Sequence, residues 1–175
     1  MRDVFANIVV RDEEPSDINA IYNLTKRAFL GKRYSDGNEQ DLINALRDGG
    51  ALAQSLVAEE AGEIVGHIAI SPAVAKNGSD DWYALGPIAV EPARQRHGIG
   101  SILISYCMER LVASNARGCI VLGDTGYYPR HGFVHRPDLA PDGQPTAHYM
   151  VRPLNGQTPD KVVDFHPIFQ MTGTP

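Results

Sequence analysis

The sequence predicts one α/β (α+β) domain, built on a mixed sheet with helices on both faces. Helical and extended patterns alternate along the chain, an order typical of this fold class. The 175 residues are enough for one domain with its own core, and neither an internal repeat nor a linker divides them. We therefore expect a single domain over residues 1–175. Its core covers about 7–152, and a C-terminal tail, 153–175, packs on that core.

The composition is that of an ordinary globular protein, with 43% hydrophobic and 21% charged residues. A net charge of −5 gives nucleic-acid binding no electrostatic support, and no segment is long and apolar enough to cross a membrane. Charged residues interrupt the N-terminal stretch, which does not resemble a signal peptide. Cys107 and Cys119 lie outside any Cys-x-x-Cys pattern and are interpreted as buried free thiols. We expect a cytoplasmic protein without nucleic-acid or membrane partners.

The first half of the chain predicts a strand, two helices and a hairpin. A β-branched run forms the strand at 7–11, and the proline and acidic residues of Glu14–Asp17 are typical of a helix start. That helix carries one apolar stripe, made of Ile18, Ile21, Tyr22, Thr25, Ala28 and Phe29. A second helix at 39–47 stops at paired glycines. The runs 55–59 and 64–70 flank a glycine-containing turn and form the hairpin.

The second half continues the alternation. A loop at 76–81 connects the hairpin to an apolar run, 83–90, which predicts a buried strand. A helix follows, and its spacing predicts an inward face of Ile99, Ile102, Leu103, Tyr106, Cys107 and Leu111. The later elements are a strand at 119–122, a short helix at 125–131, extended chain at 132–134, a loop at 137–146 and a last strand at 147–152.

The passage from the strand at 83–90 into the next helix describes an anion site. Gly98 and Gly100 allow backbone N–H groups to approach a ligand closely. The helix N-terminus adds unpaired donors at the positive end of a dipole, and Arg94 and Arg96 add charge. We interpret this loop as a cradle for a diphosphate. The alternative is that the glycines only close a tight turn and the arginines are surface charge.

Two common phosphate-binding motifs do not fit the loop. A P-loop requires Lys followed by Ser or Thr after its glycines, and neither pair is present. A Rossmann fingerprint requires glycine or alanine three residues after the second glycine, where Leu103 stands and would block close helix–strand packing. The pattern that remains is Gln95-x-x-Gly98-x-Gly100.

That pattern resembles the acetyl-CoA loop of the GNAT N-acetyltransferase superfamily, Gln/Arg-x-x-Gly-x-Gly/Ala. The flanking sequence matches too, in Leu85-Gly86-Pro87-Ile88-Ala89-Val90-x-Pro92, Ser101-Ile102-Leu103-Ile104 and Tyr127-Tyr128-x-x-x-Gly132-Phe133. Gly123-Asp124 and Leu46-Arg47 make the chain most similar to the YhbS-like predicted acetyltransferases, from about Asn7 to about Phe169. The resemblance implies the GNAT fold, whose mixed sheet is mostly antiparallel and contains one splayed strand pair.

The resemblance also implies an acetyl-CoA site. Backbone groups of Ile88, Ala89 and Val90 would bind the pantetheine arm in the gap between the splayed strands, and one of their N–H groups would polarise the thioester carbonyl. The loop that would hold the diphosphate comprises Gln95, Arg96, His97, Gly98, Ile99, Gly100 and Ser101.

The family's general acid is a tyrosine four residues before the Gly-Phe pair, which corresponds to Tyr128. A tyrosine hydroxyl suits protonation of the leaving thiolate because the two pKa values are close. Tyr127 is the second candidate for the acid, and a core aromatic is the alternative interpretation of Tyr128. The pattern does not determine the base, for which Glu59, Glu91 and Asp124 are candidates.

The expected reaction is therefore transfer of an acetyl group from acetyl-CoA to a primary amine by direct attack. A non-catalytic acyl-CoA-binding or regulatory module and a transferase for a longer acyl-CoA are the alternatives. The acceptor, a small-molecule or peptide amine, is not identified by any motif; Arg33 and Tyr34 are candidate contacts, and a homodimer is left open. We expect no metal, because the six histidines form no ligand motif and His67 alternates with apolar neighbours on a strand.

Overall fold

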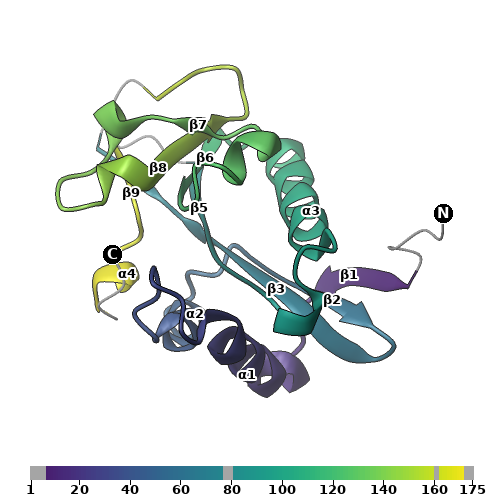
Figure 1. Ribbon diagram of the computed structural model, residues 1–175. Helices are drawn as coiled ribbons and strands as arrows, with labels where there is room; N and C mark the ends of the chain where they lie inside the picture. Colours follow the sequence, from purple (N-terminus) through teal and green to yellow (C-terminus); the bar gives the residue numbers. More distant parts are fainter. Residues whose placement is uncertain (1–6, 77–80, 160–161, 172–175) are drawn as a thin grey trace.

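A seven-stranded sheet forms the centre of the computed structural model, which describes residues 7–76, 81–159 and 162–171 (Figure 1). Its strand order is β1-β2-β3-β5-β6-β8-β7. The strands are β1 (Ile8–Asp12), β2 (Gln54–Glu60), β3 (Glu63–Pro72), β5 (Trp82–Val90), β6 (Gly118–Leu122), β7 (Val134–His135) and β8 (Tyr149–Pro153). Every pairing is antiparallel except the parallel pair β5–β6. The prediction of a mixed, mostly antiparallel sheet is confirmed.

Helices cover both faces of this sheet, as predicted (Figure 1). Helices α1 (Ile18–Phe29) and α2 (Glu39–Asp48) pack on one face, and α3 (Ile99–Ala113) packs on the other. Alternation along β2 explains the two layers: Val57 packs with α1 and α2, whereas its neighbour Leu56 packs with α3. None of the helices in the described ranges has the length and apolar character that a bilayer crossing requires.

The prediction for the buried face of α3 was wrong on one flank. Tyr106, expected to point inward, is 45% exposed, whereas Ile104 and Met108 are buried. The centre of the face, from Ile99 through Leu103 to Leu111, is as predicted. Apolar residues lie around most of this helix, so the periodicity does not indicate on which side of the row from Ile99 to Leu111 the sheet lies.

The other boundaries agree with the predictions to within a few residues. A 3₁₀ turn at Pro15–Asp17 precedes α1. The short helix expected at 125–131 contracts to a 3₁₀ turn at Tyr128–His131, and two further 3₁₀ turns occur at Pro137–Leu139 and Thr146–His148. In the loop expected at 76–81, residues 77–80 lie outside the described residues. The antiparallel pairing of β3 with β5 shows that this loop closes a hairpin.

Strands β5 and β6 are paired over a short distance only. Trp82, Tyr83 and Ala84 oppose Gly118, Cys119 and Ile120, and β5 then continues to Val90 without a neighbour on that edge in the described part of the sheet. The two strands therefore diverge, as the resemblance implied. The divergence leaves one edge of the second half of β5 open.

The C-terminal segment packs on the α2 face. Strand β9 (Val163–Asp164) pairs with β4 (Val74–Ala75), and helix α4 (Ile168–Met171) contacts α2. Val163, Phe165 and Phe169 are buried in one cluster with core residues of β5, β6 and β8. The buried hydroxyl of Tyr149 donates a hydrogen bond to the Val163 carbonyl at 2.7 Å. These contacts add apolar cover to the half of the sheet where β5 and β6 are paired.

Candidate functional site

The chain turns sharply between β5 and α3. The N–H of Glu91 still donates to the Val65 carbonyl of β3 at 2.9 Å, and a 3₁₀ turn, Pro92–Arg94, follows. Arg96 and Gly98 then have left-handed φ values of 64° and 84°, and α3 starts at Ile99. Gly98 suits this position because glycine has no Cβ penalty there.

Backbone donors gather in this turn. In the chain that the structure describes, the N–H groups of residues 96–101 have no backbone acceptor. They belong to the loop and to the first turn of α3, where helix geometry supplies no partner. Two side chains of the loop stabilise it through backbone carbonyls. The Gln95 amide donates to the Val90 carbonyl at 3.1 Å, and His97 Nδ1 lies 2.8 Å from the Gln95 carbonyl oxygen. The arrangement is an anion-binding geometry.

The open edge of β5 presents backbone groups beside these donors. In an antiparallel pair, successive residues direct their N–H and C=O groups to opposite edges. Since Glu91 bonds to β3, the polar groups of Ala89 also face β3, and those of Ile88 and Val90 face the gap. The side chain of Ala89 packs on α1. Two of the three expected strand residues therefore offer backbone groups to a ligand in the gap.

Gly100 is the point where three parts of the site meet. A Cβ placed on Gly100 would lie 3.1 Å from the Tyr127 hydroxyl oxygen, 3.7 Å from Ile88 Cδ1 and 3.8 Å from Val90 Cγ2. The loop, the open strand and the tyrosine turn thus converge within a few ångströms. Sequence reasoning expected the first two to meet but gave no indication of the contact with Tyr127, because no local pattern encodes it.

The two tyrosines are held by a compact turn that Asp124 organises. The Asp124 carbonyl accepts the N–H groups of Tyr127 at 3.0 Å and Tyr128 at 3.1 Å, and its carboxylate accepts the Gly126 N–H at 2.8 Å. The 3₁₀ turn that follows ends at Gly132, whose φ is 81°. The tyrosine positions are therefore set by backbone hydrogen bonds as well as by packing.

Tyr128 lies deeper than Tyr127. Its side chain is 8% exposed, packs edge-on against Phe133 and lies directly over Gly123. Burial, followed by the nearby Tyr127 and Tyr34 hydroxyls, raises the pKa of Tyr128 well above its usual value. No hydrogen bond of its hydroxyl occurs among the described residues. Tyr128 therefore stays protonated at neutral pH and has a proton available to donate.

The carboxylates proposed as bases differ in their surroundings. Glu59 forms an ion pair with Arg11 at 3.0 Å, and Glu91 forms one with Arg27 at 2.7 Å. Asp124 is exposed, and within the described ranges it has no ion-pair partner. Asp124 is also the only one of the three that belongs to the tyrosine turn.

The cations near the loop are not equivalent either. Arg94, half-buried, forms an ion pair with Glu60 at the β2–β3 hairpin, so its charge is neutralised. Arg96 is exposed and forms no ion pair in the described part of the chain. Of the two arginines expected to add charge to the cradle, only Arg96 is left without an ion-pair partner among the described residues.

The loop at 31–38 supplies an exposed aromatic side chain, Tyr34. Its ring contacts Phe29 edge-on at 6.3 Å, and partial burial together with the charges of Glu39 and Asp124 raises its pKa. Glu39, which is 5% exposed and accepts a hydrogen bond from Ser35 at 2.9 Å, was not foreseen. The sequence indicates only that Glu39 is an acidic residue in the first turn of a helix, which does not predict its burial. Arg33 is exposed.

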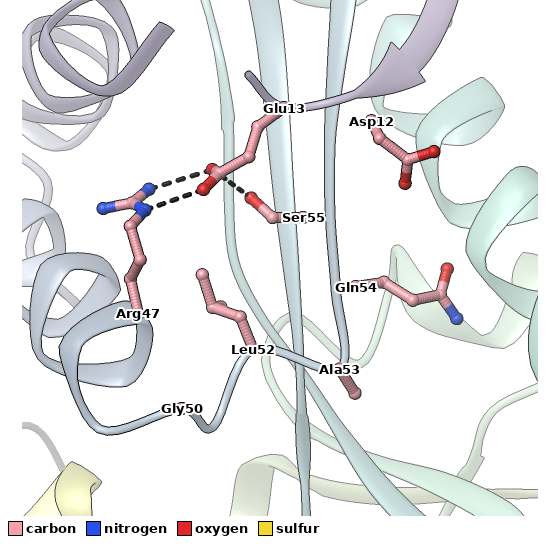
Figure 2. Close-up of a pocket in the computed structure, with 8 residues that line it drawn as sticks. All are labelled: Asp12, Glu13, Arg47, Gly50, Leu52, Ala53, Gln54 and Ser55. Carbon is pink, nitrogen blue, oxygen red and sulfur yellow. Dashed lines mark hydrogen bonds and ion pairs between the residues drawn. The ribbon is translucent and has the colours of Figure 1, made fainter. Parts of the chain in front are cut away.

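A separate hollow of about 390 Å³ lies near the start of β2, and Figure 2 shows its walls. Arg47 and Ser55 both point to the Glu13 carboxylate, and Ser55 also lies 2.8 Å from Nε2 of the fully buried His67. None of the residues lining the hollow comes from β5, the loop or the tyrosine turn. His67 is packed, as predicted. No group of three or more His, Cys, Asp or Glu able to hold a metal occurs in the ranges described.

Comparisons with known proteins agree with this geometry. The family model for the acetyltransferase (GNAT) family matches residues 18–133. The uncharacterized N-acetyltransferase YjhQ of Escherichia coli is 36% identical over 124 residues, which are 69% of this chain and 66% of YjhQ, just under two thirds of its length. The uncharacterized N-acetyltransferase YhbS of the same species is 30% identical over 127 residues, 72% of this chain and 73% of YhbS.

Two crystal structures superpose well on this fold. A GNAT family acetyltransferase from Brucella melitensis, in complex with acetyl-CoA, gives a TM-score of 0.82 at 39% identity and covers 93% of this chain and 97% of its own. Escherichia coli YhbS, in complex with CoA, gives 0.82 at 26% identity, over 94% of this chain and 92% of its own. The chain described here therefore belongs to the acetyltransferase (GNAT) family.

Proposed function

We propose that this protein transfers an acetyl group from acetyl-CoA to a primary amine by direct attack of the amine on the thioester. The observation that carries the proposal is the convergence at Gly100, where unpaired N–H groups of the loop meet the open edge of β5. A diphosphate and an extended amide-containing arm fit this pair of features, and CoA contains both. The acetyl-CoA and CoA complexes of the two similar structures support the choice of ligand.

The loop residues would hold the diphosphate and the strand would align the arm. Gln95, Arg96, His97, Gly98, Ile99, Gly100 and Ser101 form the loop and first helical turn assigned to the diphosphate. Backbone groups of Ile88 and Val90 would bond to the arm as an added strand does, with Ala89 between them bonded to β3. When bound, acetyl-CoA supplies an activated acyl group. A strand N–H directed at the thioester oxygen would stabilise the charge that develops there.

Tyr128 would protonate the departing thiolate. A tyrosine hydroxyl is protonated at neutral pH whether or not its pKa is raised, and this one has no hydrogen-bond partner among the described residues. The acceptor nitrogen must lose a proton as its bond to the acetyl carbon forms and the carbon–sulfur bond breaks. We assign this proton to Asp124, directly or through water, because Glu59 and Glu91 are engaged in ion pairs.

The first test is binding of acetyl-CoA to the purified protein. A ligand that binds only the native state raises the melting temperature, and the rise increases with concentration. We expect such a shift with acetyl-CoA, and release of the CoA thiol when a panel of primary amines is added. No shift at millimolar acetyl-CoA would contradict the proposed function. A shift without thiol release from any amine would instead indicate an acyl-CoA-binding module.

The second test removes the proposed acid. Tyr128→Phe keeps the ring and deletes the hydroxyl, so we expect acetyl-CoA affinity to be retained and turnover to fall by about 10²–10⁴-fold. Tyr106→Phe, on the exposed side of α3, is the matched control and should behave as wild type. Unchanged turnover in Tyr128→Phe would show that the acid lies elsewhere.

A further inference from the structure

The turn from Asp124 to Gly132, which holds the proposed acid Tyr128, also carries Tyr127. The proposed role of Tyr128 does not explain the position of Tyr127. The Tyr127 hydroxyl oxygen would lie 3.1 Å from a Cβ on Gly100, so it stands against the first turn of α3. The hydroxyl has no hydrogen-bond partner within the described residues, although it faces a region rich in backbone donors. Ile88 and Val90 approach the same point from the open strand. Tyr127 thus borders the cradle at Gly100.

The Tyr127 ring is held in place by its neighbours. It contacts Tyr128 edge-on at 5.2 Å and His131 at 5.0 Å. The Arg130 guanidinium lies over the ring, 5.1 Å from its centroid, a distance at which cations are attracted to aromatic faces. The turn itself is secured by the hydrogen bond from the Tyr127 N–H to Asp124. Its hydroxyl is therefore presented in one defined direction.

Arg130 brings an uncompensated charge to the same place. It is exposed, donates a long hydrogen bond of 3.5 Å to the Gly126 carbonyl, and has no carboxylate partner in the ranges that the structure describes. Arg94, the nearest candidate in the loop sequence, is neutralised by Glu60. Arg96 and Arg130 form no ion pair in the described part of the chain and are therefore the arginines available to an anion at this helix start.

We infer that Tyr127 and Arg130 form the second wall of the diphosphate site. The Tyr127 hydroxyl donates a hydrogen bond to a diphosphate oxygen, and Arg130 supplies charge while keeping the ring in its orientation. In this arrangement the two adjacent tyrosines have separate tasks: Tyr127 binds the cofactor and Tyr128 donates the proton. The inference rests on the proposed function, because it requires CoA to occupy the cradle.

The test compares CoA with pantetheine, which lacks the diphosphate. A lost hydrogen bond to a charged group corresponds to about tenfold in affinity, so Tyr127→Phe should raise the Kd for CoA by about that factor. Arg130→Gln should raise the Kd several-fold, and its effect should diminish at high salt, since an exposed charge is screened. Neither variant should change pantetheine affinity. The loss in Tyr127→Phe should be larger in the KM for acetyl-CoA than in kcat.

Matched controls separate this effect from general damage. Tyr106→Phe and Arg117→Gln alter exposed residues of the same types, one in the middle of α3 and one beyond its C-terminal end, and both should bind CoA as wild type does. Wild-type CoA affinity in Tyr127→Phe would overturn the inference. Equal losses for CoA and pantetheine would also overturn it, because the defect would then be structural. Loss of turnover with intact binding would overturn it as well and would assign the acid to Tyr127. Failure of the proposed function is distinct, since wild type itself would then not bind CoA.

Discussion

The position of Tyr128, the proposed acid, depends on Gly123, which lies beneath its ring. A Cβ on Gly123 would lie 2.2 Å from Cε2 of the Tyr128 ring and 2.8 Å from its Cδ2. The ring cannot easily move away, because Phe133 and Tyr127 pack against it edge-on. Position 123 therefore requires glycine because the Tyr128 ring approaches it closely, and the three atoms nearest to a Cβ there all belong to that ring.

Gly123→Ala should displace Tyr128. Overpacking of a buried site costs about 1–3 kcal/mol, and we expect a loss of that size in urea unfolding together with a larger relative fall in turnover than in acetyl-CoA affinity. Gly126→Ala, in the same turn, is the control for stability alone: its nearest neighbour is the end of the exposed Asp124 side chain, which can move, but Asp124 is the proposed base. Wild-type stability and turnover in Gly123→Ala would show that the ring tolerates the shift.

At the scale of elements, the position of α3 against the sheet is set by a glycine on the strand. Leu103 is fully buried, and its Cδ1 would lie 3.0 Å from a Cβ on Gly66 of β3; Ile99 Cγ2 would lie at 2.8 Å. In a Rossmann turn the close approach depends on a small residue in the helix. Here the helix carries the large residue and the strand carries the small one, so α3 still packs tightly where its N-terminus meets β5.

Gly66→Ala should push the start of α3 away from the sheet. We expect a loss of about 1–3 kcal/mol in stability and weaker CoA binding, because the loop donors would shift relative to β5. Adding Leu103→Ala to Gly66→Ala returns space at the contact, so the two changes should cost less together than the sum of the single variants. Strict additivity in urea unfolding would contradict a direct contact between them.

At the scale of the whole molecule, a buried polar network joins the N-terminal segment, α2 and the sheet. Arg47 of α2 donates two hydrogen bonds to Glu13, and Ser55 donates to the same carboxylate (Figure 2). The Ser55 hydroxyl also lies 2.8 Å from Nε2 of His67. Burial is the main cause that lowers the pKa of His67 from 6.5 to about 4; the nearby Glu13 opposes this shift and Arg47 adds to it. His67 is thus neutral in the folded protein over the physiological range.

This shift predicts a specific dependence of stability on pH. Below about pH 6.5 the unfolded chain protonates His67 and the folded chain does not, so the free energy of unfolding falls as the pH decreases toward about 4. The share due to His67 is about 2 kcal/mol between about pH 7.5 and pH 5. Urea unfolding at both pH values should show that His67→Gln loses this share of the dependence. An identical pH dependence in the variant would contradict the assignment.

The sequence alone determined the local elements and the turn from β5 into α3, because both depend on neighbouring residues. Hydrophobic periodicity specifies each helix and strand, and the spacing Gln95, Gly98, Gly100 together with the flanking strand specifies the turn into α3. The antiparallel hairpin and the burial of His67 followed from the same kind of pattern. These predictions hold because the alternation of apolar and polar residues along a segment already indicates which of its side chains the folded protein buries.

Only the tertiary structure decided which side chains meet across the fold. Two contacts join segments that are far apart in the sequence: Glu60 neutralises Arg94, and Tyr127 contacts Gly100. Packing against distant segments also gives the neighbouring Tyr127 and Tyr128 different environments. The flank of α3 that faces the sheet was decided in the same way, since an almost uniformly apolar helix has no preferred side until the sheet is present. Such contacts depend on the packing of whole elements, which no spacing of residues along one segment encodes.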